Sequence, residues 1–345
     1  MSIRTKTIAV IAVTLVVLIS ALYVALGNIL MSGFRAVEHA DAQKNVLRVS
    51  DAIKADIDGI QNSLFTWTQW DPAYQYIEDR NQAFAKDNFS STMFTGMKIA
   101  YCVFIDPRFQ FPYAGGYDLK AGRDIPVPDE LLRALTPDSV LLKNTDPNKA
   151  VRGILTLKDQ TLLVAAAPIT DTKGTAPARG HILFAKPLDA AEVKLLGDTT
   201  HLSVAVSRDV PPLEGIAVAA KNGDVIQGRT VLVDIAGRPA LLMTVDVPRE
   251  IYKQGTRSLQ YLMVSIIAIG VVFGIVIAIL VETIVLRRVL RVSALMTAKT
   301  QSLDFSETIP VQGRDEISRL TTSINGMICA VSEFLSQLQA SDQGR

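Results

Sequence analysis

The chain has 345 residues, with 35 Lys and Arg against 34 Asp and Glu, so its formal net charge is only +1. A chain this close to neutral lacks the excess of basic residues that nucleic-acid-binding proteins use, and that class of partner is excluded. Apolar residues make up 49% of the chain, which suits two soluble units combined with apolar segments that cross a membrane.

The first apolar run covers residues 8–30 and is long enough to cross a hydrocarbon core of ~30 Å as a helix. Arg4 and Lys6 precede it, as in a signal peptide, but the apolar part of a signal peptide is shorter and ends at a small-residue cleavage site. We therefore expect an uncleaved transmembrane helix after a short terminal segment, residues 1–7.

The helical pattern continues past the first apolar run. Apolar residues recur there in steps of three or four, which predicts one long amphipathic helix ending near Asp71 and Pro72: Val46, Val49, Ile53, Ile57, Ile60, Leu64 and Trp67. This stripe can pack on its own domain or on a second copy of the chain, and the pattern does not separate the two.

The next part of the chain mixes helix and strand signals. We expect helices over 72–88 and 126–135, and strands over 99–106, 109–117, 153–159, 161–170 and 180–188. The order predicts an α+β domain, in which a long N-terminal helix and an antiparallel sheet with helices on one face form a PAS/Cache-like core over about 40–190. A short helix over 190–196 then leads to a smaller β lobe, about 198–250, with strands expected over 201–207, 215–221, 229–235 and 239–247.

A second apolar run, residues 261–281, predicts a second transmembrane helix within 259–286. Arg287, Arg288 and Arg291 follow it, so the positive-inside rule places both termini in the cytoplasm and residues 31–258 outside. In a bacterium this means an inner-membrane protein with a periplasmic domain. Cys102 and Cys329 then lie on opposite sides of the membrane and cannot form a disulfide.

The last part of the chain carries a coiled-coil pattern. Seven apolar residues alternate in steps of three and four, the seam of a coiled coil: Ile317, Leu320, Ile324, Met327, Val331, Phe334 and Leu338. Gly270 and Gly274 form a G-x-x-x-G in the second apolar run, which lets two helices approach closely. Both features favour a homodimer, with a four-helix bundle within 287–338 and a tail over 339–345.

Residues 67–88 resemble the signature of the fourth class of CHASE sensor domains. The matching positions are Trp67, Trp70, Asp71, Tyr74, Phe84 and Asn88, and Thr66 stands where the family usually has an acidic residue. The segments ending at Asp106 and at Ile169, with Gly180 and Leu188, also look like this family. The resemblance implies an extracytoplasmic sensor domain over about 40–190.

Residues 287–331 resemble a HAMP linker, the cytoplasmic relay of bacterial receptors. Val285, Val289, Val292 and Met296 form the seam of its first helix, and the connector buries Leu303, Ile309 and Val311. Arg288 stands where the first helix commonly has a proline. The resemblance assigns signal relay to Val289, Val292, Met296, Glu316, Ile317, Leu320, Ile324 and Met327. Receptors of this type, including two-component systems, control a histidine kinase or a cyclic-di-GMP enzyme, and no such domain occurs here. We expect either a fragment of a longer receptor or a separate output protein.

Two sets of residues are candidates for ligand binding. Trp67, Trp70 and Tyr74 share one helical face with Asp71 beside them, which fits either an aromatic cage for a cationic group or an ordinary packed core. The second set lies near strand ends: Tyr101, Tyr113, Tyr117, Asp118 and Arg152.

The chemistry-bearing residues form no catalytic or metal-binding pattern. His39, His181 and His201 are far apart, and no nucleotide-binding or nucleophile motif occurs, so we expect no cofactor, no metal and no enzyme in this chain. The sequence therefore predicts a dimeric membrane receptor for a small molecule or a periplasmic protein that acts on a cytoplasmic effector. The alternative is a membrane-anchored adaptor whose outer domain docks a partner protein.

Overall fold

A computed structural model describes residues 3–302 and 307–342, with 334–342 as backbone only. The chain divides into two compact units. One unit is Gly33–Lys253, and the other combines Met1–Ser32 with Gln254–Arg345.

The unit Gly33–Lys253 is built on the second half of helix α1 (Ile3–Thr68). The residues of the predicted apolar stripe are all at most 7% exposed and belong to the core of this unit: Val46, Val49, Ile53, Ile57, Ile60, Leu64 and Trp67. The stripe therefore packs on its own domain, which resolves the alternative that its period left open.

The larger sheet has six antiparallel strands in the order β3-β2-β1-β6-β5-β4. Its strands are β1 (Tyr101–Ile105), β2 (Tyr113–Asp118), β3 (Arg123–Ile125), β4 (Val151–Thr156), β5 (Thr161–Pro168) and β6 (His181–Pro187). Every residue of β1 and β5 is buried, because these central strands are covered on both faces. The predicted antiparallel α+β domain is confirmed.

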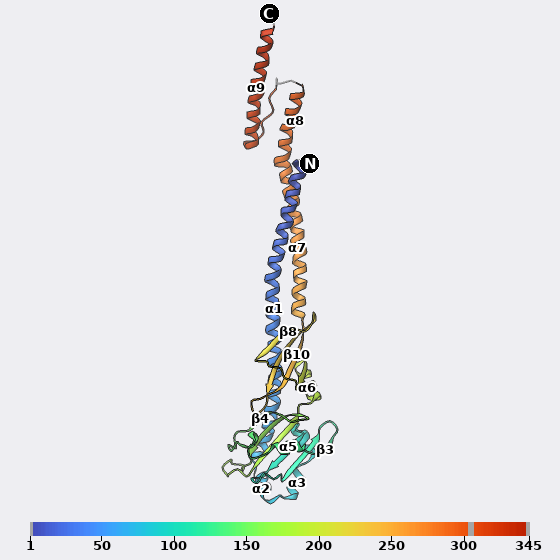
Figure 1. Cartoon of the computed structure of the whole chain (residues 1–345), viewed down its shortest axis with the longest axis vertical. Coiled ribbons are helices and arrows are strands. Elements are labelled where there is room, and N and C mark those ends of the chain that lie inside the picture. The colour runs from blue at the N-terminus through green and yellow to red at the C-terminus, as the bar shows by residue number, and fades with distance from the viewer. Residues whose placement is uncertain (1–2, 303–306, 343–345) are drawn as a thin grey trace. The chain divides into compact units, whose positions relative to one another are not determined.

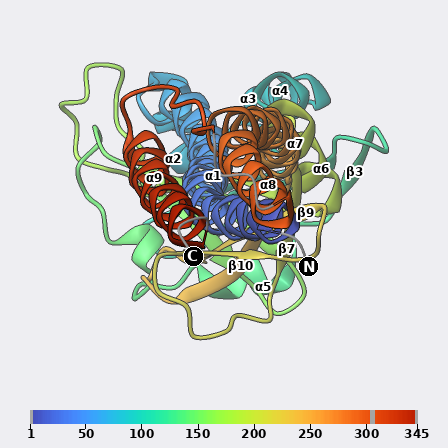
Figure 2. The same cartoon turned by 90° about the horizontal axis from the view of Figure 1, so that it is seen from above.

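Helices cover both faces of this sheet, so the prediction of helices on one face is wrong. Cys102 and Phe104 of β1 pack toward α1, α2 (Asp71–Asp79) and α4 (Ser91–Met97). Their neighbours in the strand, Tyr101 and Val103, pack on the other side, where α5 (Asp129–Ala134) and the 3₁₀ turn η1 (Val140–Leu142) supply leucines. Figure 2 shows α3 (Gln82–Asn88) and α4 on one side of α1 and α5 on the other. The helix expected over 126–135 forms this second layer as α5, whereas the three-residue turn η1 was not predicted.

The smaller sheet has four antiparallel strands in the order β7-β10-β9-β8. Its strands are β7 (Ser203–Ser207), β8 (Ile216–Ala220), β9 (Val225–Val233) and β10 (Pro239–Pro248), and α6 (Ala190–Thr200) precedes it. Figure 1 shows β8 and β10 beside α1. Gly228 of β9 faces α1 so closely that an added Cβ would lie 2.4 Å from a methyl group of Val46.

Local backbone geometry divides what the sequence predicted as one helix over 72–88. Arg80 ends α2 in the left-handed conformation at φ 51°, and the Asn81 side chain then caps α3 by accepting from the backbone N–H groups of Ala83 and Phe84. Helix α4 and strand β3 were not predicted, because each is short and carries no periodic signal.

The second unit contains the apolar parts of α1 and α7 (Glu250–Leu280). By length and composition, these two helices can each cross a membrane. An added Cβ at Gly270 would lie 2.6 Å from Ile19, and one at Gly274 would lie 3.1 Å from Leu15. The G-x-x-x-G therefore faces α1 of the same chain and gives no support to a homodimer.

Beyond α7 the helix changes to a π-helix over Val281–Leu286 and resumes as α8 (Arg287–Ser302), and α9 spans Glu316–Asp342. Two polar links join α8, the connector and α9. Arg288 binds Asp315, the Gln312 carbonyl and the Ser318 hydroxyl. The Asn325 amide exchanges two hydrogen bonds of 2.8 Å with the backbone of Ile309.

The face of α9 that is buried within one chain is not the predicted seam. Ser318, Thr321 and Ile328 are at most 5% exposed. Leu320, Met327 and Val331 of the seam are 56%, 68% and 43% exposed. Of the other residues predicted here, Leu303 and the side chains of Phe334 and Leu338 lie outside the described residues.

Candidate functional site

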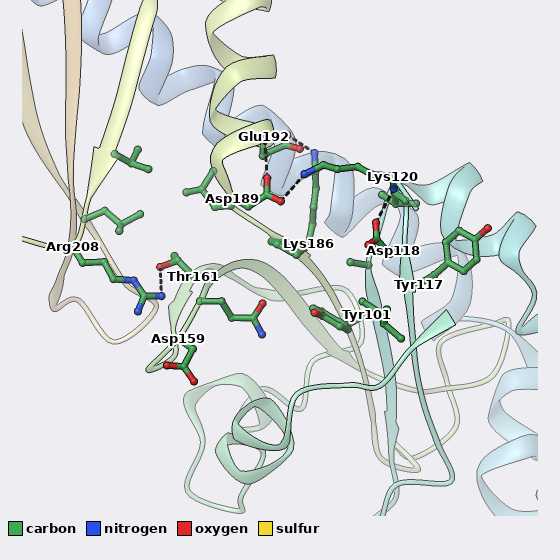
Figure 3. A pocket seen from close by; sticks show the side chains of 18 of the residues that line it. Tyr101, Tyr117, Asp118, Lys120, Asp159, Thr161, Lys186, Asp189, Glu192 and Arg208 are labelled. Carbon is green, nitrogen blue, oxygen red and sulfur yellow. Dashed lines mark hydrogen bonds and ion pairs between the residues drawn. The ribbon is translucent and has the colours of Figure 1, made fainter. Parts of the chain in front are cut away.

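A cavity of about 510 Å³ lies between the two sheets of the unit Gly33–Lys253. This volume is within the range of small-molecule sites. Its lining comes from the ends of β1, β2, β6 and β7, the β4–β5 turn and the start of α6 (Figure 3). Three of the predicted binding residues, Tyr101, Tyr117 and Asp118, line it.

Tyr101 forms the apolar part of the large-sheet wall. It is paired with Gly116 across β1 and β2, and an added Cβ at Gly116 would lie 2.9 Å from the Tyr101 ring and 2.8 Å from the Ile125 carbonyl. Only glycine at 116 leaves room for this ring beside the edge strand β3. Burial raises the pKa of Tyr101, so its hydroxyl stays protonated at neutral pH and can donate a hydrogen bond.

Asp118 is held at the end of β2 by its own turn. Its Oδ1 accepts from the backbone N–H groups of Lys120 at 2.9 Å and Ala121 at 3.0 Å. These N–H groups, Ala121 first, lower the pKa of Asp118 and keep it ionised. The Lys120 side chain reaches across to Asp189, with Nζ 2.7 Å from Oδ2.

Asp189 has two roles at the start of α6. Its Oδ1 accepts from the backbone N–H groups of Ala191 and Glu192, both at 2.9 Å, and thereby caps the helix, while Oδ2 binds Lys120. Burial acts against the charge of Asp189, but these bonds prevail and lower its pKa. The cap positions the first turn of α6 in the cavity wall.

Lys186 joins the cavity to α1. Its ammonium group binds the Glu192 carboxylate and lies 3.8 Å from Oδ2 of Asp56, a residue of α1. The side chains of Lys186 and Glu192 are only 12% and 11% exposed. Burial raises the pKa of Glu192, against the opposing effect of Lys186. A change at this lysine therefore acts on both α6 and α1.

Arg208 supplies a charge from the small lobe. Its guanidinium donates to the Lys158 carbonyl and to the Thr161 hydroxyl, both in the β4–β5 region of the large sheet (Figure 3). Among the described residues, no carboxylate lies within ion-pair distance of it. Arg208 thus connects the lobes through neutral acceptors and keeps donors for a ligand.

The aromatic face for which the sequence left both a cage and a packed core open lies in the hydrophobic core. Trp67 is 7% exposed, and its ring centroid lies 5.6 Å from that of Trp70, 5.9 Å from Phe89 and 6.2 Å from Phe104. Tyr113 stacks on Phe89 with 3.6 Å between centroids, and burial raises the pKa of Tyr113 far above its usual range. None of these residues lines the cavity.

The three remaining predicted residues have contacts that hold loops and strands in place. Asp71 accepts from the Thr172 N–H at 2.9 Å, and Tyr74 donates to the Pro177 carbonyl at 3.0 Å, so both fasten the loop after β5. Arg152 lies 3.2 Å from Asp58 and ties β4 to α1. None of these three residues lines the cavity between the two sheets.

Six charged residues of the cavity were not predicted from the sequence: Lys120, Asp159, Lys186, Asp189, Glu192 and Arg208. One signal was available, since Asp189 directly precedes a helical pattern and has Glu192 three residues later, as at a capped N-terminus. Nothing local identifies the others. In the described part of the chain, no group of three His, Cys, Asp or Glu residues could hold a metal ion.

Comparison with known proteins matches one domain family in this chain. Residues 52–207 match the model of the CHASE4 domain, so the predicted resemblance is confirmed. A curated relative, the methanogenesis regulatory histidine kinase FilI of Methanothrix harundinacea (strain 6Ac), is 21% identical over 325 residues. The match covers 92% of this chain but only 37% of that kinase, so the chain spans little more than a third of its relative.

Among solved structures, the extracellular domain of vpHK1S-Z8, assigned as a histidine kinase, has a TM-score of 0.44 at 13% identity. The structural match covers 64% of this chain and 96% of that extracellular domain. The periplasmic domain of Vibrio cholerae LuxQ has a TM-score of 0.38 at 9% identity and covers 60% of this chain and 99% of that one. Identification of the sensor domain rests on the CHASE4 match.

Proposed function

We propose that this chain, which contains a CHASE4 domain, is the receptor part of a membrane signalling protein and binds a small molecule in the cavity between its two sheets. The observation that carries the proposal is the cavity itself, about 510 Å³ with charged groups from both lobes on its walls. A protein-docking adaptor needs no such cavity, so its presence favours the receptor over the alternative.

The proposed topology places residues 8–30 and 259–286 across a bacterial inner membrane, with 31–258 in the periplasm and both termini in the cytoplasm. Its support is the pair of helices suited to crossing a membrane and the arginines at 287, 288 and 291 that follow the second. The sensor core then occupies about 40–190 and the smaller lobe about 198–250.

Signal output from the cavity is proposed to run through α1 and α7. Lys186 connects the cavity to Asp56 of α1, and strand β10 of the small lobe ends at Pro248, directly before α7 begins at Glu250. A ligand that contacts both lobes changes how they sit on α1, and the coupling of ~1–3 kcal/mol typical of allosteric proteins is sufficient to alter an output.

Residues 287–338 are proposed to act as a HAMP-type linker in a homodimer. The exposed seam of α9, Leu320, Met327 and Val331, supplies an apolar stripe that a second copy can cover. Arg288, at the position where a proline is common, joins α8 to α9 through the Asp315 carboxylate and the Ser318 hydroxyl. The effector, a histidine kinase or a cyclic-di-GMP enzyme, is proposed to lie in a longer form of the chain or in a separate protein.

The binding proposal is tested with the full chain in lipid nanodiscs, by thermal shift against a library of metabolites. Any compound that binds the folded state alone at a concentration well above its Kd raises the melting temperature. The Asp118→Asn and Arg208→Met variants should abolish that shift, and Lys149→Met, an exposed lysine outside the cavity, should retain it. A shift that survives both cavity variants would contradict the proposed site.

The relay proposal has its own test. In a chain joined to a kinase output, Met327→Asp should place a charge in the dimer seam and uncouple output while leaving the ligand-induced thermal shift unchanged. Glu333→Asp, which keeps the charge in the same helix, is the control. Normal signalling by the Met327 variant would count against the relay.

A further inference from the structure

A buried ion pair joins the two helices at the ends of the unit Gly33–Lys253. Glu38 belongs to α1, and Arg249 is the residue directly before α7. Nε and Nη2 of Arg249 donate to the two oxygens of Glu38 at 3.0 and 2.9 Å. The side chains of Glu38 and Arg249 are 3% and 11% exposed, so this bidentate pair is shielded from water.

Arg249 is held by further contacts. Its backbone N–H donates to the Asp224 carbonyl at 2.8 Å, and its Nη1 donates to the Asn222 carbonyl at 3.3 Å. Its guanidinium lies 4.1 Å from the centroid of the Tyr252 ring, and Lys253 pairs with Asp224 at 2.8 Å. The first turn of α7 is therefore fixed to the β8–β9 turn as well as to α1.

Strand β9 fixes α1 in the same part of the unit. An added Cβ at Gly228 would meet Val46 at 2.4 Å and the Ala42 carbonyl at 3.4 Å, so the strand lies directly on the helix. Asn45, 5% exposed, is held by a hydrogen bond of 3.0 Å to Asp41. Glu38 lies one turn before Ala42 and two turns before Val46, so it cannot shift along the helix axis without moving them.

We propose that the Glu38–Arg249 pair is a clamp that keeps α1 and the start of α7 in fixed axial register, so that ligand binding turns the two helices about this point and does not slide one along the other. The part of this inference that concerns ligand binding rests on the proposed function. A slide of one helical turn moves a residue by about 5.4 Å, beyond hydrogen-bond reach. It would leave the buried Glu38 carboxylate unpaired, which is strongly unfavourable.

The clamp is tested by pulsed electron paramagnetic resonance on the full chain in nanodiscs. Spin labels are attached at Lys44→Cys on α1 and Glu250→Cys on α7, both exposed, in a Cys329→Ser background. We expect one narrow distribution for the distance within a chain, measured on labelled chain diluted with an excess of unlabelled chain. Glu38→Gln, which keeps the size but removes the charge, should broaden it about twofold, because a neutral amide cannot hold the guanidinium bidentately.

A matched control is the exposed pair of Asp51 and Lys54 on the same helix, with side chains 69% and 70% exposed. Asp51→Asn should leave the distribution unchanged. A Glu38→Gln protein that melts cooperatively and keeps the narrow distribution overturns the proposal. If Glu38→Gln does not fold, the Arg249→Lys variant is measured instead, since it keeps the positive charge but cannot make the bidentate contact with Glu38. A broader distance distribution in this variant supports the clamp, and an unchanged distribution overturns it.

The distance measurement needs no ligand. If the distance measurement overturns the clamp, the ligand-induced thermal shift is unaffected. If no compound in the library binds, the distance distribution is unaffected. The two proposals can fail separately.

Discussion

Replacing Trp67 by alanine distinguishes core from binding site at the end of α1. The indole is 7% exposed and lies within 6.3 Å, centroid to centroid, of four other aromatic rings. Truncation removes roughly 150 Å² of buried apolar surface, which corresponds to about 4 kcal/mol at about 25 cal/mol per Å². The usual range for a buried tryptophan or phenylalanine cut to alanine, about 3–5 kcal/mol, agrees.

For a unit of this size, each kcal/mol lowers the melting temperature by about 2–4 °C, so Trp67→Ala should melt roughly 10 °C lower. Thermal unfolding of the full chain by circular dichroism measures the shift. Trp67→Phe should lose less, because it keeps a ring in the cluster. Leu195→Ala, at a side chain 54% exposed in α6, should remain within about 0.5 kcal/mol of the parent. A Trp67→Ala protein as stable as that control, but without ligand response, would refute the core assignment.

Three further predictions concern other parts of the chain. Gly180→Ala should destabilise the domain by more than about 2 kcal/mol in urea unfolding, because φ is +107° and the new Cβ would lie 2.0 Å from a backbone oxygen; an unchanged midpoint would contradict this. A backbone N–H of α9 and the Arg288 guanidinium lower the pKa of Asp315 to about 2, below its unfolded value of about 3.9. The link between α8 and α9 should therefore hold above pH ~4 and weaken as pH falls toward 2. The measure is the protection factor for amide hydrogen exchange in α9, which should fall with pH and be low already at pH 7 in Asp315→Asn. In the folded chain, thiol reagents should label the exposed Cys329 quickly. Cys102 should stay unlabelled until the chain unfolds, because it is buried and burial raises its pKa. Rapid labelling of both cysteines in the folded chain would disprove the burial of Cys102.

Prediction succeeded where the signal is local. The buried stripe of α1 follows from steps of three and four, because a helix repeats its faces every 3.6 residues whatever packs against it. Apart from β3, the strands of both sheets were placed within a few residues, since β-rich segments bounded by turn residues carry their own signature. The two apolar helices follow from composition alone.

The candidate site was predicted only in part. Tyr101, Tyr117 and Asp118 were among the candidates because they stand near strand ends, and all three line the cavity. Lys186, Glu192 and Arg208 carry no motif, and they meet only because strand ends far apart in sequence surround one cavity. The register of the sheets determines which side chains come together at the cavity, and this register depends on pairing between segments that are distant in sequence.

The sequence by itself determined the plan of this protein: two membrane-length helices, an antiparallel α+β domain between them and an amphipathic helical end. Only the tertiary structure determined which side chains contact one another. Trp67 belongs to the core, Gly270 faces Ile19 of the same chain, and Glu38 meets Arg249 across 211 residues. The physical reason is range: periodicity is a property of neighbours along the chain, whereas a cavity or a buried ion pair exists only after distant segments have packed.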